Sequence, residues 1–278
     1  MPEGHTLHRL ARELTDVFGE RRVRVSSPQG RFAESAAQLD GGLLLDADAW
    51  GKQLFVRFDG ERFIHIHLGL YGKLDVHHDA PEVPAPVGQV RLRVQSATAY
   101  ADLRGATTCA LVTTAQRDAV VARSGPDPLR EDADPSAAWA RIKRSASPIG
   151  VLLMDQSVLA GVGNVYRAEV LFRHRIHPLR PGRSLRPTQW QAMWDDLVEL
   201  MAEGVRTGRI DTVRPEHTPE AMGRPPRVDD HGGEVYVYRR TGQPCLVCGR
   251  GVRTEVLSGR NVFWCSRCQP VFRSRAAR

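Results

Sequence analysis

The sequence predicts an α+β protein of more than one domain, and three observations support this prediction. At 278 residues the chain is long enough for about two hydrophobic cores. The hydrophobic pattern has the period of strands from residue 23 to about residue 112, and the period of helices from residue 149 onward. Four of the five cysteines lie in the last 34 residues, in two closely spaced pairs. We therefore expect a β-rich N-terminal domain, a helical domain and a small unit held together by cysteines.

The N-terminal domain is expected to be a β-sandwich that is preceded by one helix. Apolar residues recur on one face with the 3.6-residue period over residues 6–18. Two alternating runs, 53–58 and 61–68, flank the turn Asp59-Gly60 and predict a β-hairpin. We assign residues 1–124 to this domain.

The second half is expected to be helical. Residues 125–148 begin with a stretch rich in Pro, Asp and Gly, which is typical of a linker. Helical periodicity follows at 149–156, resumes at 164–172 after a glycine-containing turn, and returns in a longer helix at 187–205. We assign residues 149–234 to this helical domain.

The C-terminal cysteines form two Cys-x2-Cys pairs separated by sixteen residues: Cys245 and Cys248, then Cys265 and Cys268. Each pair can turn both thiolates inward, so the spacing predicts a zinc ribbon over residues 235–278 with one structural Zn²⁺ ion. Two disulfides or a redox pair are the alternatives. No signal peptide is recognisable, so we expect a reducing compartment, where disulfides are rare. The fifth cysteine, Cys109, lies in an apolar run and is expected to be a buried small hydrophobe.

Basic residues concentrate around these cysteines. From residue 239 to residue 278 there are nine arginines and one acid, Glu255, whereas the net charge of the whole chain is only +7. Guanidinium groups fork onto phosphate oxygens, so this cluster favours nucleic acid over a merely solvated tail. No apolar stretch approaches the ~20 residues of a membrane span. We expect a monomeric, cytoplasmic protein that binds nucleic acid and has no membrane partner.

A glycine-rich turn predicts an anion site in the helical half. The segment 160–163 contains two glycines, and Asn164 follows it at the start of a helix. The first N–H groups and the dipole of a helix attract an anion, which would be a phosphate if the zinc ribbon binds DNA. The alternative is that Asn164 simply caps the helix.

The N-terminus predicts a nucleophile. Removal of Met1 would leave Pro2 with a free secondary amine, and an α-amino group is partly unprotonated at neutral pH. Such an amine can attack an electrophilic carbon and form an iminium, as lysine does in Schiff-base enzymes. Glu3 beside it can donate a proton if its site excludes water.

Seven motifs occur together in the order in which a known enzyme family has them: 1–6, 51–55, 67–72, 125–129, 153–156, 161–166 and 259–265. Over essentially its full length the chain resembles the formamidopyrimidine-DNA glycosylase and endonuclease VIII family, and it is most similar to the endonuclease VIII branch of high-GC bacteria. The resemblance implies an N-terminal β-sandwich with a leading helix, followed by a helix–two-turn–helix domain with a zinc ribbon.

The resemblance also implies the catalytic residues. Pro2 would attack C1′ of the sugar, and Glu3 would protonate the ring oxygen of the sugar. Lys52 would support activation of the nucleophile and β-elimination, and Arg260 would assist δ-elimination. Without the resemblance, Lys52 would be interpreted as a surface lysine at the start of a strand.

The same resemblance implies the residues that contact DNA. Asn164 and Arg260 would clamp phosphates that flank the lesion, and Arg123 matches an arginine that contacts DNA. Residues 69–71, which are Gly69, Leu70 and Tyr71, match the loop that fills the gap left by an everted base. Ordinary core packing is the alternative for Leu70.

We therefore predict a bifunctional DNA glycosylase and abasic-site lyase of base-excision repair, located in the bacterial cytoplasm near the nucleoid, with damaged DNA as partner. Oxidised pyrimidines are the expected substrates. The alternatives are 8-oxoguanine or formamidopyrimidine as main substrate, or a zinc protein that binds damaged DNA without cutting it. The chain departs from residues common in relatives at three positions. Thr6 concerns the chemistry of the base pocket, and Gly69 concerns the handling of the base opposite the lesion. Arg239 adds charge near the DNA face.

Overall fold

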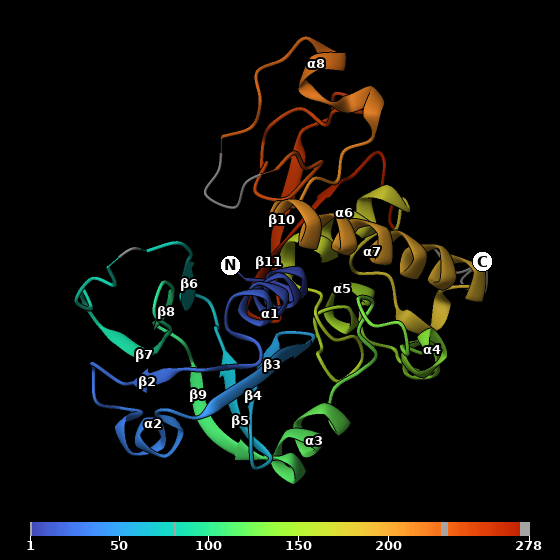
Figure 1. The fold of residues 1–278 in the computed structure, drawn as a ribbon. Helices are drawn as coiled ribbons and strands as arrows, with labels where there is room; N and C mark the ends of the chain where they lie inside the picture. Colours follow the sequence, from blue (N-terminus) through green and yellow to red (C-terminus); the bar gives the residue numbers. More distant parts are fainter. Residues whose placement is uncertain (1, 81, 229–232, 273–278) are drawn as a thin grey trace. The chain divides into compact units, whose positions relative to one another are not determined.

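The computed structural model describes residues 2–80, 82–228 and 233–272. The chain divides into two compact units, Met1–Arg123 and Ser124–Arg278. Figure 1 shows both, with the strands of unit 1 in blue to green and the helices and ribbon of unit 2 in green to red.

Unit 1 is built on two antiparallel sheets, with strand orders β1-β3-β4-β5-β9 and β2-β7-β8-β6. Its elements are, in chain order, α1 (Gly4–Phe18), β1 (Arg21–Arg22), β2 (Arg24–Ser26), α2 (Ala33–Leu39), β3 (Leu43–Trp50), β4 (Gln53–Phe58), β5 (Arg62–His67), β6 (Lys73–His77), β7 (Val90–Gln95), β8 (Tyr100–Arg104), β9 (Thr108–Thr113) and α3 (Thr114–Ala122).

One hydrophobic core joins helix α1 to both sheets. Leu54 pairs with Ile66, and Val56 with Ile64, across β4 and β5, and all four side chains are buried. They share this core with the apolar face of α1 and with residues of the second sheet such as Leu103. The period-2 and period-3.6 patterns therefore direct apolar side chains to one interior. The predicted sheet domain with a leading helix is confirmed.

Unit 2 is mainly helical among its described residues and ends in a two-stranded sheet. Its elements are α4 (Pro135–Ile142), α5 (Ile149–Leu152), α6 (Asn164–Arg173), η1 (Gly182–Ser184), α7 (Pro187–Thr207), η2 (Pro215–His217), α8 (Pro219–Met222), β10 (Val252–Leu257) and β11 (Arg260–Cys265). Among the described residues, none of the helices combines the length and the apolar character that a membrane crossing requires.

Two helices differ from the sequence prediction. Helix α4 lies inside the segment 125–148 that was predicted as a linker, and its Ala138 and Ile142 are fully buried in the core of unit 2. Asp134 caps this helix through the N–H of Ser136. This segment is therefore part of the unit's core. Helix α5 is a single turn that ends at Leu152, so the period over 149–156 does not correspond to a continuous helix.

Helix α7 and the ribbon have the predicted form. The apolar stripe of α7, which includes Trp190, Trp194 and Leu197, is buried in the core of unit 2. Strands β10 and β11 pair antiparallel from Val252↔Cys265 to Leu257↔Arg260. The core therefore extends from the helices into the strands that carry the cysteines.

Candidate functional site

The chain's N-terminal residues lie at the start of helix α1. Glu3 is the N-cap residue of this helix, with extended backbone, and its side chain is 0% exposed. The carbonyl oxygen of Glu3 accepts a hydrogen bond from the N–H of Thr6 at 2.9 Å. Pro2, directly before it, is half-buried. The carboxyl group beside the candidate nucleophile is therefore shielded from bulk water.

Helix α1 runs along strand β3 and away from the turn that holds Lys52, so its start lies nearest that turn. The N–H of Ala47 donates to Thr15 Oγ1 at 2.9 Å, and the N–H of Glu20, just after the helix, donates to the carbonyl oxygen of Leu45, nearer the start of β3, at 3.3 Å. The start of α1 therefore lies beside the end of β3. This direction brings the residues before α1 to the end of unit 1 where β3 turns into β4.

That turn consists of Gly51 and Lys52. Trp50 pairs with Gln53, so only two residues connect the strands, and Gly51 has a φ of +57°. A two-residue hairpin turn needs such a conformation, which glycine adopts without strain. His67, at the end of β5, donates from Nδ1 to the carbonyl oxygen of Lys52 at 2.9 Å. The backbone of Lys52 is therefore fixed by the neighbouring strand.

The loop after β5, residues 68–72, lies at the same end of unit 1. Leu70 is 54% exposed and Tyr71 is 90% exposed, in contrast to the buried Leu68. Gly69 has a φ of +70°, and a Cβ there would lie 2.0 Å from Oγ1 of Thr107. The loop is thus packed against the β8–β9 connection and presents two apolar side chains to solvent. Ordinary core packing does not account for Leu70.

Arg123 follows helix α3. The helix begins at Thr114, and Thr113 just before it pairs with Arg62 at the start of β5. Arg117, one turn later, makes an ion pair with Asp48 of β3 at 3.4 Å. The helix therefore runs back along the first sheet toward the Lys52 turn, and the exposed Arg123 ends it on that side.

Histidine 5 in α1 has a perturbed pKa. Its burial, and to a smaller extent the charge of Arg9, lower the pKa of His5 from 6.5 to about 4. Its Nε2 lies 3.3 Å from Oγ1 of Thr6. The imidazole is therefore neutral at neutral pH, and it adds no positive charge beside Glu3.

In unit 2 the glycine turn leads into helix α6. Gly163 is the N-cap residue, and Asn164 is the first helical residue. The side chain of Gln156 holds the turn, because its Oε1 accepts from the N–H of Gly161 at 3.0 Å and its Nε2 donates to the carbonyl oxygen of Val162 at 2.9 Å. The Asn164 side chain therefore does not cap the helix, which removes the alternative interpretation of this residue.

Arg167 orients the Asn164 side chain. This arginine is 2% exposed, and its Nη2 donates to Oδ1 of Asn164. The same nitrogen donates to the carbonyl oxygen of Asn261 at 2.8 Å, and Nη1 donates to that of Gly150 at 3.1 Å. A guanidinium group can only donate, so it must face the amide oxygen of Asn164 and leave the amide N–H groups available to an acceptor such as phosphate.

The same network reaches the ribbon at Asn261, the residue after Arg260. Ser258 and Gly259 both have positive φ and form a two-residue turn between β10 and β11, directly before Arg260. Arg260 is exposed, and its neighbour Asn261 is the residue that Arg167 binds. Arg167 thus contacts one predicted phosphate ligand of unit 2, Asn164, and the residue next to the other, Arg260.

The four C-terminal cysteines form one cluster. Their Sγ atoms all lie within 4.8 Å of one another, and none is in a disulfide. The distances are 3.9 Å between Cys245 and Cys268 and 3.4 Å between Cys248 and Cys265. Tetrahedral Zn²⁺ with Zn–S bonds of about 2.3 Å requires sulfur atoms about 3.8 Å apart. The cluster fits one structural zinc ion, with no ligand position left for a reacting water.

Cys109 lies in the core of unit 1, as predicted. It is buried, and its burial raises the pKa of the thiol to about 12. Such a thiol stays protonated and unreactive at neutral pH.

Sequence reasoning missed several buried polar residues that support these sites. Glu169 accepts four hydrogen bonds of 2.6 to 2.9 Å, from Thr212 Oγ1 and from the N–H groups of residues 236–238. Gln269 accepts from the N–H of Cys265 at 3.0 Å and donates to the carbonyl oxygen of Ile176 at 2.8 Å. For Glu169 the signal was an acidic residue within a largely apolar stretch of α6, whereas Gln269 lies outside the helices and gave no such signal.

Three known protein families match successive parts of the chain. The formamidopyrimidine-DNA glycosylase N-terminal domain matches residues 1–109, and the formamidopyrimidine-DNA glycosylase H2TH domain matches residues 124–215. The zinc finger found in FPG and IleRS matches residues 242–271, which include all four clustered cysteines. The sheet domain, the helical domain and the zinc ribbon are each recognised separately.

Relatives match the chain over its full length. The Mycobacterium tuberculosis protein named "Endonuclease 8 1" is 54% identical over 271 residues, which are 97% of this chain and 100% of that protein. A formamidopyrimidine-DNA glycosylase of Thermus thermophilus is 31% identical and covers 97% of each chain.

Solved structures share the fold. The Lactococcus lactis Fpg protein, crystallised with DNA that contains an abasic site, superposes with a TM-score of 0.79 at 22% identity, over 97% of this chain and 100% of that one. The MutM (Fpg) protein of Thermus thermophilus gives a TM-score of 0.74 at 27% identity, over 96% and 98%. Together with the three domain matches, these similarities show that the chain belongs to the formamidopyrimidine-DNA glycosylase and endonuclease VIII family.

Proposed function

We propose that this chain releases oxidised bases from DNA, with pyrimidines preferred, and then cuts the abasic site through a Schiff base on Pro2. As a family member, it is a DNA glycosylase and abasic-site lyase of base-excision repair. One observation supports the finer scheme most. The residues before α1, the Gly51-Lys52 turn and the loop 68–72 converge on one end of unit 1, with Glu3 fully buried there.

The first step requires a free amine on residue 2. We infer that removal of Met1 exposes the secondary amine of Pro2, whose lone pair attacks C1′ of the sugar. The bond from C1′ to the base breaks, and the base takes up a proton as it leaves. Glu3 protonates the ring oxygen, so the sugar opens and an iminium forms between Pro2 and C1′. The position of Glu3 supports this role, because its carboxyl group is buried directly beside Pro2.

Elimination then cleaves the strand. Loss of a proton from C2′ of the iminium expels the 3′-phosphate in β-elimination, and Lys52 supports this step. A second elimination expels the 5′-phosphate, with Arg260 assisting. Water then adds to the remaining iminium, and loss of the sugar fragment as an aldehyde regenerates the amine of Pro2. The His67 contact to the Lys52 backbone supports this assignment, because it fixes the turn that carries the lysine.

Binding of the duplex requires phosphate contacts and a substitute for the everted base. We propose that Asn164, Arg260 and Arg123 hold phosphates, because such contacts position the protein without reading sequence. Leu70 and Tyr71 would fill the gap, since their exposed apolar side chains can replace the stacking that base eversion removes. Gly69 contributes no side chain to this loop, because a Cβ there would collide with Thr107.

Single-turnover rates on a panel of lesions test the substrate assignment. We expect thymine glycol and dihydrouracil to be released faster than 8-oxoguanine from otherwise identical duplexes. The reverse order would favour the alternative, in which 8-oxoguanine or formamidopyrimidine is the main substrate. Binding of every lesion without release of any would instead indicate a protein that recognises damage and does not cut.

We also propose that the protein acts as a monomer in the bacterial cytoplasm, at the nucleoid. The concentration of arginines at the ribbon supports association with DNA. Light scattering of the protein alone and with one lesion duplex would test this, because a monomer should form a complex of one protein and one duplex.

A further inference from the structure

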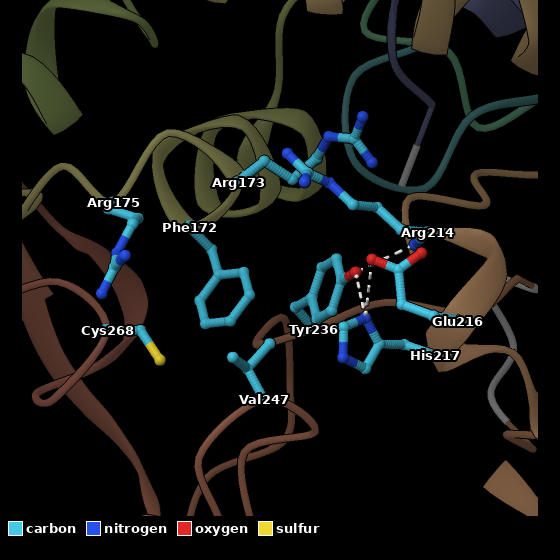
Figure 2. Close-up of a pocket in the computed structure, with 9 residues that line it drawn as sticks. All are labelled: Phe172, Arg173, Arg175, Arg214, Glu216, His217, Tyr236, Val247 and Cys268. Carbon is cyan, nitrogen blue, oxygen red and sulfur yellow. Dashed lines mark hydrogen bonds and ion pairs between the residues drawn. The ribbon is translucent and has the colours of Figure 1, made fainter.

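A cavity of about 350 Å³ lies in unit 2 beside the zinc cysteines. Its floor contains the stacked rings of Phe172 and Tyr236, whose centroids are 4.5 Å apart. Figure 2 shows Arg175 and Cys268 on one side of these rings, and Arg214 with His217 on the other. Neither Asn164 nor Arg260 lines this cavity, so it is separate from the proposed phosphate contacts of unit 2.

The backbone of Arg175 is unusual. Helix α6 ends at Arg173 with His174 as C-cap, and Arg175 follows with a φ of +58°. This position after a helix is usually glycine, because a Cβ is strained in the left-handed conformation. A strained residue of this kind persists only when the surroundings fix it, and it often has a function.

Contacts on the residues that follow hold Arg175 against the ribbon. The carbonyl oxygen of Ile176 accepts from Nε2 of Gln269, the residue after Cys268, at 2.8 Å. The ring of His177 packs edge-on against Trp264 with centroids 5.5 Å apart, and Trp264 directly precedes Cys265. The segment after α6 therefore contacts the residues next to both cysteines of the second pair. The ribbon thus sets the position of Arg175.

Three arginines line the cavity, and Arg175 is the one that lies on the Cys268 side of the rings, whereas Arg214 lies on the other side (Figure 2). Four thiolates around one Zn²⁺ leave the zinc site with a net negative charge. The charge of Arg173 is already matched, because its guanidinium binds Asp196 at 2.6 and 2.7 Å. Within residues 2–80, 82–228 and 233–272, Arg175 has no ion-pair partner, and no carboxylate lines its side of the cavity. A cation at that place lowers the electrostatic cost of collecting four thiolates.

We propose that Arg175 is a positioning residue of the zinc site: its guanidinium balances the negative charge of the thiolates on the Cys268 side and slows the loss of zinc. It does not ligate the metal. The left-handed backbone keeps its side chain on the cavity wall, which explains why arginine occupies a position that suits glycine. The proposal depends on the cysteine cluster and not on the glycosylase reaction.

The test measures the release of zinc from the full-length, zinc-loaded protein to an excess of a coloured chelator. Arg175→Gly removes the charge and relieves the backbone, so it should fold at least as stably as the wild type. It should nevertheless release zinc roughly three- to tenfold faster than the wild type. This effect is smaller than the ~10–100-fold loss of metal affinity that follows when a residue hydrogen-bonded to a metal ligand is replaced, because Arg175 is exposed. Arg175→Lys keeps the charge and should release zinc at nearly the wild-type rate.

A matched control separates this effect from a general loss of positive charge. Arg144 is exposed in the same unit and does not line the cavity, so Arg144→Ala should leave the release rate unchanged. The difference between Arg175→Gly and the wild type should shrink as the salt concentration rises, since partly exposed charges are screened. Wild-type release from Arg175→Gly, fast release from Arg175→Lys, or an equal effect of Arg144→Ala would overturn the proposal.

Discussion

Replacement of Arg167 by alanine should damage both the stability of unit 2 and its binding of DNA. The Arg167 side chain is 2% exposed and donates to three acceptors, which are Oδ1 of Asn164 and the carbonyl oxygens of Gly150 and Asn261. These acceptors belong to α6, α5 and β11. Removal of the guanidinium would leave all three without this donor and would open a void between the three elements.

The expected loss of stability follows from these contacts. A buried acceptor that loses its partner costs about 1–3 kcal/mol, so three acceptors give an upper range of about 3–9 kcal/mol. Water entering the void and the avoided desolvation of a buried cation reduce this value. We therefore expect about 3–5 kcal/mol, as for other broken buried charge networks. The matched control is Arg206→Ala, because Arg206 is exposed and its ion pair, among the residues the structure describes, is with Glu203 on the surface; its urea unfolding curve should stay close to that of the wild type.

Two measurements on the same proteins test this prediction. Urea unfolding gives the loss of stability, and fluorescence anisotropy with an undamaged duplex gives affinity at several salt concentrations. Arg167→Ala should weaken binding about tenfold or more, because Asn164 loses its orientation and the ribbon strand loses its tie. Part of the salt slope of about 0.9 per cationic phosphate contact should also disappear, since Arg260 is displaced. Stability within about 1 kcal/mol of the wild type, with unchanged affinity and slope, would refute the role of Arg167.

Three further predictions concern other parts of the chain. Cys248→Ser should purify with far less than one zinc per chain by elemental analysis while the sheet domain keeps its strand signal by circular dichroism; a full complement of zinc would contradict a four-cysteine site. Burial lowers the pKa of His5 from 6.5 to about 4, so the unfolded chain binds this proton at a higher pH than the folded chain does. The free energy of unfolding should therefore fall as the pH drops from 6.5 toward 4, by up to roughly 3 kcal/mol. His5→Gln should flatten this part of the stability profile in thermal unfolding, and an unchanged slope would show that other groups cause it. Gly69→Ala should destabilise unit 1 by about 1–3 kcal/mol, because the new Cβ would lie 2.0 Å from Oγ1 of Thr107. Adding Thr107→Ala should recover part of this loss, and strictly additive effects would argue against the collision.

Patterns that are local in sequence predicted much of the fold. The 3.6-residue period located α1 to within two residues of its start, and Asp59-Gly60 between two alternating runs located the hairpin of β4 and β5. The spacing of the cysteines predicted the ribbon, because a Cys-x2-Cys pair determines its own local geometry. In each case the sequence over a few residues determines the structure.

Helix α4 was missed although its start is visible in the sequence. Asp134 provides an N-cap and Pro135 occupies the first turn, which is a usual combination at a helix start. The linker was predicted because the residues before Asp134 are rich in Pro, Asp and Gly. The opposite error occurred at 149–156, where an apolar period continued beyond the single turn of α5.

The polar supports of the site could not be predicted from one sequence. Arg167 matters because it reaches Asn261, which lies 94 positions later in the chain. Likewise, Gln269 connects the second cysteine pair to Ile176. Pairings between distant segments depend on the tertiary fold, and periodicity carries no information about them. The resemblance to the family supplied Asn164 and Arg260, but not Arg167, which contacts Asn164 and the neighbour of Arg260.

The most direct test of the central claim is to find which residue forms the covalent intermediate. Borohydride added during the reaction with a lesion duplex should reduce the iminium and leave a permanent protein–DNA crosslink, and peptide mapping should place it on Pro2 of a chain that lacks Met1. One added N-terminal residue should abolish the crosslink, because the nitrogen of Pro2 would then belong to an amide. A crosslink on Lys52, or normal cleavage of lesions by the extended chain, would contradict the assignment of Pro2 as the nucleophile.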